Sequence, residues 1–119
     1  MNKTIFLGIA VAAVALGAIF FGQEKESVAS PLDGFAQCLS SKGVVMYGAD
    51  WCPHCQSEKK KFGASFQYVS YVECPDNPKQ CLDAGVEGYP TWTFPDGKRL
   101  TGDRELSELS EASGCVLPE

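Results

Sequence analysis

Two cysteines lie three positions apart in the stretch Cys52-Pro53-His54-Cys55. Cysteines at this spacing perform thiol–disulfide exchange, because one thiolate attacks a foreign sulfur and the other closes or resolves the disulfide. The competing interpretation is half of a structural zinc site, which normally needs four ligands. His54 is the single histidine, and the other cysteines do not supply a second finger pair. The pattern therefore favours a redox centre and predicts no metal site.

The elements on either side of this motif predict which sulfur reacts. Residues 44–49 form a nearly continuous apolar run typical of a buried strand, and residues 56–62 read as a short helix. A cysteine at such a junction lies at the helix N-terminus, where unpaired N–H groups and the helix dipole favour a thiolate. Pro53 suits the first helical position, since it has no N–H to satisfy. We expect Cys52 to attack and Cys55, more buried, to resolve the mixed disulfide.

The N-terminal part of the 119-residue chain predicts a membrane segment. Residues 4–22 carry no charge and would rise about 28 Å as a helix, close to the thickness of a bilayer core. Residues 1–22 are thus an anchor, or a signal peptide cleaved near residues 27–29, and the length of the run favours the anchor. Lys3 precedes the segment and acidic residues follow it, so the rest of the chain is expected outside the cytoplasm.

The remainder divides into a polar linker, residues 23–31, and one soluble domain, residues 32–119. Six cysteines in so short a chain indicate an oxidising compartment: a periplasm, the cell exterior or a space like the thylakoid lumen. The formal net charge is −5, and no basic stretch with interleaved aromatic residues is present, which argues against a nucleic-acid partner.

The hydrophobic pattern of the domain alternates helices with strands. Helices are expected over residues 33–42, 56–62 and 79–84 and from a cap at Asp103 to Gly114; strands are expected over 44–49, 66–73, 91–94 and 98–101. The resulting order, helix–β–α–β–α–β–β–α, is that of a compact α/β domain.

A second motif, Gly88-Tyr89-Pro90-Thr91-Trp92, follows the first by 38 residues, counted from Cys52 to Pro90. With both motifs the chain resembles the thioredoxin superfamily. The resemblance implies a four-stranded mixed sheet with flanking helices and a cis-proline at Pro90 beside the CxxC. The backbone before this proline would be free to pair with a substrate peptide. Trp51 and Tyr89 are expected to form a substrate rim with Pro90, and Trp92 to pack in the core.

Within that superfamily, four stretches are similar to the thioredoxin-like domain of bacterial and plant vitamin K epoxide reductase homologues: Met46-Tyr47-Gly48-Ala49, Trp51–Gln56, Tyr71-Val72-Glu73-Cys74 and Gly88–Trp92. That domain is commonly fused to a helical membrane oxidase. The resemblance implies that this chain oxidises protein or peptide dithiols without a cofactor and passes the electrons to a separate, quinone-linked membrane oxidase.

The other four cysteines form two candidate pairs. Related domains carry a cysteine pair around the loop that Cys74 and Cys81 flank, so the resemblance implies a structural disulfide there, with a second redox pair as the alternative. A bond between Cys38 and Cys115 would tie the first helix to the tail. The sequence leaves open whether these two pair or remain free thiols.

The direction of electron flow is predicted from two residues. His54 within the motif stabilises a thiolate, and the tetrapeptide CPHC also occurs in strong periplasmic oxidants. Met46 stands where thioredoxins carry a buried aspartate, so no internal base for Cys55 is evident. Asp50, Glu58 and the run Lys59–Lys61 are expected on the surface. We predict an oxidant, with a disulfide reductase and a non-catalytic metal-binding or peptide-binding module as alternatives.

Overall fold

The structure is a computed structural model that describes residues 29–119. The predicted membrane anchor, residues 1–22, and residues 23–28 of the predicted linker lie outside the described residues. In the part that is described, every helix is too short or too polar to cross a bilayer.

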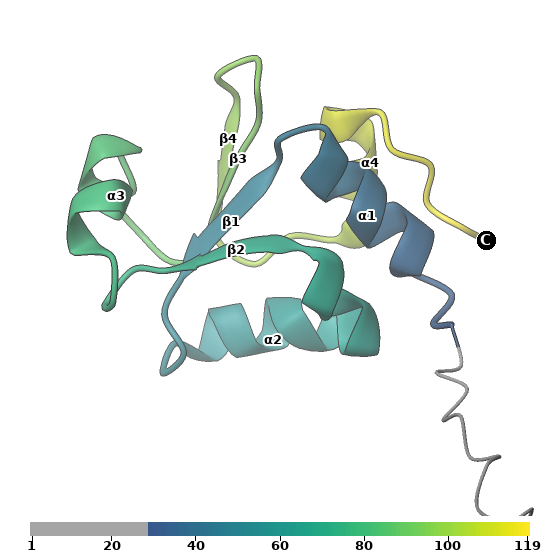
Figure 1. The fold of residues 1–119 in the computed structure, drawn as a ribbon, viewed down its shortest axis with the longest axis horizontal. Coiled ribbons are helices and arrows are strands. Elements are labelled where there is room, and N and C mark those ends of the chain that lie inside the picture. Colours follow the sequence, from purple (N-terminus) through teal and green to yellow (C-terminus); the bar gives the residue numbers. More distant parts are fainter. Residues whose placement is uncertain (1–28) are drawn as a thin grey trace, which may run out of the picture.

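Four helices, one 3₁₀ helix and four strands make up residues 29–119 (Figure 1). In chain order they are α1 (Asp33–Ser41), β1 (Val45–Gly48), α2 (Pro53–Phe62), η1 (Gly63–Tyr68), β2 (Ser70–Glu73), α3 (Pro78–Asp83), β3 (Thr91–Thr93), β4 (Arg99–Thr101) and α4 (Leu106–Ser113). The strand order is β2-β1-β3-β4, with β1 and β2 parallel and the other neighbours antiparallel. The predicted four-stranded mixed sheet is confirmed.

The sheet separates a large core from a small one. Side chains alternate along β1, so Met46 points into the large core and Tyr47 into the small one. The large core joins α1, α2 and α4 to the sheet. The Phe62 ring lies 6.0 Å from that of Phe35 and 5.9 Å from that of Trp92, which is fully buried as predicted. Each such side chain stabilises the fold by about 1.5–3 kcal/mol through burial.

The predicted strand over residues 66–73 is too long. Residues 63–68 are the 3₁₀ helix η1, and strand β2 begins only at Ser70. The aromatic alternation at positions 66 and 68 imitates a strand, but Phe66 packs edge-on against Phe62 and Tyr71. The helical turns after α2 are thus stabilised by aromatic packing rather than by pairing with β1.

The last helix begins later than predicted. Glu105 precedes its first residue, and no side chain caps it. Asp103, the predicted cap, instead accepts hydrogen bonds from Ser57 and Lys61 of α2. Asp103 binds α2 instead of capping α4 because the segment between β4 and α4 packs against α2.

Two disulfides staple the domain. Cys74 and Cys81 are bonded, with Cα atoms 5.7 Å apart, and lie in the small core near α3. Cys38 and Cys115 are also bonded, with Cα atoms 5.9 Å apart. Both α1 and α4 pack into the large core, which brings these two distant cysteines together (Figure 1).

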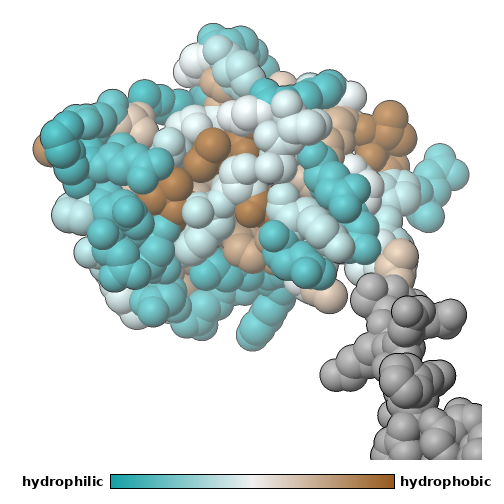
Figure 2. Space-filling model, viewed as in Figure 1, coloured by the Kyte–Doolittle hydropathy of each residue, from teal (hydrophilic) through white to brown (hydrophobic). Residues whose placement is uncertain are grey.

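In the view of Figure 2 the surface is mainly hydrophilic, and its apolar patches are small and separated.

Candidate active site

Cys52 is the residue that caps the N-terminus of α2. Its backbone is extended (φ −78°, ψ 121°), and Pro53 takes the first helical position, as the sequence predicts. The Cys52 N–H donates to the carbonyl of Ala49 at 3.1 Å, which closes the turn between β1 and α2. The side chain of Cys52 therefore lies where the first N–H groups of the helix have no carbonyl partner.

The surroundings of Cys52 favour its thiolate. Burial would by itself raise its pKa, since only 6% of the residue is exposed. Hydrogen bonds from the backbone N–H and thiol of Cys55 and from the backbone N–H of His54 outweigh this effect and hold the pKa below its ordinary value. A sulfur with a lowered pKa is the kind that attacks a disulfide.

Cys55 has the opposite character. It is fully buried one turn into α2, and burial raises its pKa to about 11. The adjacent Cys52 sulfur raises it further, while the N–H of Ala49 and the charge of Lys59 oppose the shift. Cys55 therefore holds its proton at neutral pH, as a resolving thiol does until exchange begins. Both motif cysteines are free thiols in this structure.

The second predicted motif lies beside the first. The Tyr89–Pro90 peptide bond is cis, the isomer that the resemblance implied. The Cys52 thiol faces the carbonyl of Tyr89 at 3.8 Å, and Pro90 is fully buried at the start of β3. Trp51 is 66% exposed, and its ring meets the ring of Tyr89 edge-on at 6.1 Å. The tertiary fold thus brings the predicted rim residues together around one sulfur.

Pro53 and His54 are exposed between the two cysteines. Their side chains lie on the surface next to Cys52, while the backbone N–H of His54 faces the sulfur. Within residues 29–119, no group of three or more His, Cys, Asp or Glu side chains is arranged to hold a metal ion.

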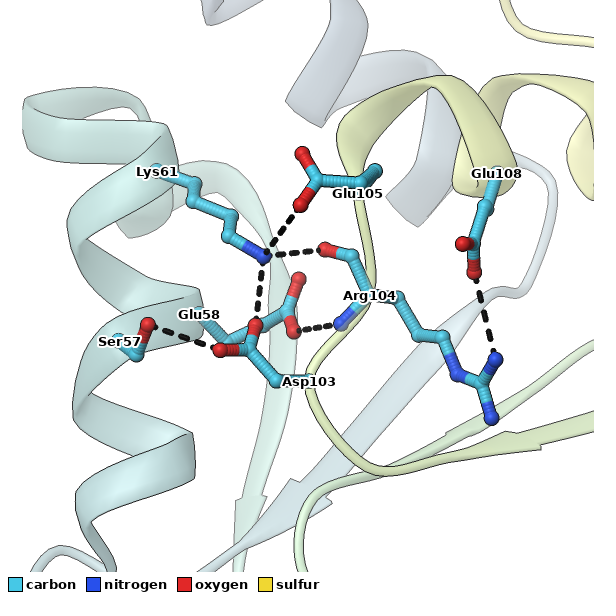
Figure 3. Close-up of polar contacts among 7 residues, drawn as sticks. All are labelled: Ser57, Glu58, Lys61, Asp103, Arg104, Glu105 and Glu108. Carbon is cyan, nitrogen blue, oxygen red and sulfur yellow. Dashed lines mark hydrogen bonds and ion pairs between the residues drawn. The ribbon is translucent and has the colours of Figure 1, made fainter.

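Glu58 was predicted on the surface, and that prediction is wrong. The side chain is fully buried where α2 meets the segment before α4 (Figure 3). One carboxylate oxygen accepts the N–H of Arg104 at 2.7 Å, and the other has no hydrogen-bond partner. Burial raises the pKa of Glu58 to about 7, helped by the neighbouring Asp103 carboxylate. A periodicity argument misses such a residue because its burial depends on a loop 46 residues away.

The basic run also differs from the expectation of a solvated face. Lys61 donates to Asp103 at 2.6 Å and to the carbonyl of Arg104 at 2.7 Å (Figure 3). Lys59 lies over the ring of Tyr71, with its nitrogen 4.1 Å from the ring centroid. The run therefore fastens α2 to two other elements, and only Lys60 is fully exposed.

Comparison with known proteins agrees with this architecture. Residues 33–113 match the thioredoxin family. The chain is 42% identical over 110 residues to thiol-disulfide oxidoreductase LTO1 of Arabidopsis thaliana, covering 84% of this chain and 29% of that protein. It is 33% identical over 94 residues to the thioredoxin domain-containing protein 5 homolog of Drosophila melanogaster, covering 65% of this chain and 22% of that protein.

Among solved structures, Fasciola hepatica thioredoxin is 26% identical with a TM-score of 0.48, over 60% of this chain and 76% of that one. The chain spans less than a third of either curated relative. It belongs to the thioredoxin family, and residues 33–113 form a domain of the thiol–disulfide oxidoreductase type.

Proposed function

We propose that this protein is a membrane-anchored, extracytoplasmic oxidoreductase that oxidises protein or peptide dithiols with the Cys52–Cys55 pair. The observation that carries the proposal is the contrast between the two sulfurs: the pKa of Cys52 is lowered and that of Cys55 is raised. A stabilised Cys52 thiolate favours the reduced form of the pair, and a pair that prefers to be reduced is an oxidant of other dithiols.

The reaction begins from the oxidised pair. A substrate thiolate attacks the Cys52 sulfur, the Cys52–Cys55 bond breaks, and Cys55 leaves as a thiolate that takes up a proton. A second substrate thiolate then attacks the substrate sulfur of the mixed disulfide. Cys52 leaves as its stabilised thiolate, and the substrate departs as a disulfide. Two electrons have moved from the substrate to the pair.

The partner that accepts these electrons is a vitamin K epoxide reductase-type or similar membrane oxidase, linked to quinone. The proposal combines the resemblance to domains fused to such oxidases with the uncharged apolar run of residues 4–22. Residues 1–22 hold the chain at the membrane, residues 23–31 are the tether, and residues 32–119 meet substrates in the periplasm or an equivalent space. Trp51 and Tyr89 provide the substrate contact surface, and the backbone before the buried Pro90 pairs with the substrate peptide.

An equilibrium titration of the full chain against glutathione tests the direction. The redox state of the pair is read by alkylation and mass spectrometry, with the other two disulfides as internal controls. We expect a potential between about −180 and −120 mV. A value near −270 mV, that of thioredoxin, would favour the reductase instead. Undiminished function of Cys52→Ser, or stoichiometric zinc, would favour the non-catalytic module.

A further inference from the structure

Thiol–disulfide exchange moves a proton to or from the buried Cys55 sulfur, and neither the CxxC motif nor the Gly88–Trp92 motif contains a group that carries it. When Cys55 leaves as a thiolate, its raised pKa means that it must gain a proton quickly, and in the reverse reaction it must lose one. Met46, fully buried, occupies the place where thioredoxins carry a carboxylate, and its thioether cannot carry a proton. The buried carboxyl of Glu58 is turned toward Asp103 and Arg104 (Figure 3).

Gly48 allows Cys55 to lie close to Tyr71 of strand β2. A methyl group added at Gly48 would lie 2.8 Å from the Cys55 sulfur, 3.2 Å from the ring edge of Tyr71 and 3.4 Å from the Tyr71 hydroxyl oxygen. The sulfur and the hydroxyl therefore approach the same point above Gly48, which they can do only because residue 48 has no side chain. These two distances place the sulfur and the hydroxyl oxygen at most about 6 Å apart, a separation that one bridging water can span.

The Tyr71 hydroxyl is hydrogen-bonded to Glu73, which lies at the surface. Tyr71 donates to one carboxylate oxygen of Glu73 at 2.7 Å, and the other oxygen accepts the backbone N–H of Asp50 at 2.9 Å. Tyr71 and Glu73 are two residues apart on β2 and so share one face of the sheet. Glu73 is partly exposed beside the turn that leads into Cys52, and thus has access to water.

The charged groups around Cys55 and Tyr71 keep the Tyr71 hydroxyl neutral, so that it can accept one proton while it donates another. The titratable groups that act on Cys55 are Cys52, Lys59 of α2 and Tyr71 of β2; those that act on Tyr71 are Cys55, Glu73 of β2 and Asp50 of the turn. Burial and the Glu73 carboxylate raise the pKa of Tyr71, so its hydroxyl stays neutral. A neutral hydroxyl both donates and accepts, and therefore passes a proton without becoming charged.

We propose, on the basis of the function proposed above, that Tyr71 and Glu73 form a proton relay between Cys55 and solvent. As the Cys52–Cys55 bond breaks, its electron pair stays on the Cys55 sulfur. The Tyr71 hydroxyl gives its proton to that sulfur and regains one from water held at the Glu73 carboxylate. The attacking substrate thiol has released one proton to water, so the count balances. In the reverse reaction every transfer runs backward.

The test is the rate at which dithiothreitol reduces the oxidised full chain, followed by stopped-flow tryptophan fluorescence between pH 5 and 8. Tyr71→Phe keeps the ring under Lys59 but removes the hydroxyl, and Glu73→Gln keeps an acceptor for the Asp50 N–H but removes the carboxylate charge. Tyr68→Phe, at an exposed tyrosine, is the matched control.

We expect both relay variants to react at least about 10-fold more slowly at pH 8, with the deficit shrinking toward pH 5, where hydronium protonates the leaving thiolate directly. The control should match the wild type. A deficit that is constant across pH would indicate a merely structural role and overturn the relay, as would wild-type rates in both variants. A wild-type chain that reacts no faster than a simple disulfide would instead refute the proposed function itself.

Discussion

Replacing Glu58 by glutamine should stabilise the protein much more at pH 8 than at pH 5. The buried carboxyl has a pKa of about 7 in the folded chain, against an ordinary value of 4.5. The folded state therefore binds this proton more tightly than the unfolded state. Its contribution to stability is complete below about pH 4.5 and is lost as the pH rises through 7. Glutamine keeps an acceptor for the Arg104 N–H but has no charge to bury.

The size of the effect follows from the separation of the two pKa values. Each pKa unit corresponds to about 1.4 kcal/mol, so full ionisation of Glu58 costs about 3–4 kcal/mol, of which about 2–3 kcal/mol falls between pH 5 and pH 8. Titration of Asp103 does not contribute to the change in stability between pH 5 and pH 8. Its hydrogen bond from Lys61 lowers its pKa to about 2, so its stabilising contribution is lost only in stronger acid.

The assay is urea unfolding of the full chain at several values between pH 5 and pH 8, with the Cys38–Cys115 and Cys74–Cys81 disulfides intact and the Cys52–Cys55 pair reduced. The informative quantity is the unfolding free energy of Glu58→Gln minus that of the wild type, which should grow with pH. Glu111→Gln, at an exposed position of α4, is the control and should show a flat difference. A flat difference for Glu58→Gln as well would refute the argument that this carboxyl is buried and protonated.

Two further changes test the packing around the site. Gly48→Ala places a methyl 2.8 Å from the Cys55 sulfur, so it should lower the unfolding free energy in urea by about 1–3 kcal/mol and slow reduction by dithiothreitol. Gly34→Ala in α1, where the methyl meets open space, is the control and should raise the unfolding free energy by up to about 1 kcal/mol. Equal effects of the two substitutions would contradict the close approach at Gly48. Removing the Cys38–Cys115 bond by alanine at both positions should lower the unfolding free energy by about 4.5 kcal/mol, because it closes a loop of 77 residues, and a loss below about 1 kcal/mol would show that the bond does not form.

The fold class and element order could be predicted because they depend on neighbouring residues. The apolar run of β1 and the proline after Cys52 each specify local geometry, and the structure contains that geometry. The cis bond before Pro90 was implied by the family resemblance, and the structure contains it as well. The failures lie where distant packing overrides a local pattern. Residues 63–68 alternate like a strand, yet contacts of Phe66 with two aromatic rings hold them in 3₁₀ turns.

The partners of the remaining cysteines show the same limit. Sequence spacing alone left the Cys38–Cys115 pair open, because nothing local indicates that α1 and α4 enter one core. Similarly, Asp103 has the type and position of a helix cap, but two hydrogen bonds to α2 take it away from α4. The N–H groups of α4 compete for the Asp103 carboxylate with every other donor that the fold brings near, and only the tertiary structure shows which donors those are.

By itself the sequence determined the chemistry of Cys52, since a cysteine followed by proline at a strand-to-helix junction meets free N–H groups whatever surrounds it. Only the tertiary structure decided which groups surround Cys55: the missing side chain of Gly48, the hydroxyl of Tyr71 and the carboxylate of Glu73. The physical reason is range. Capping and backbone polarity act within one helical turn, whereas burial and side-chain proximity arise only when strands far apart in the chain are packed together.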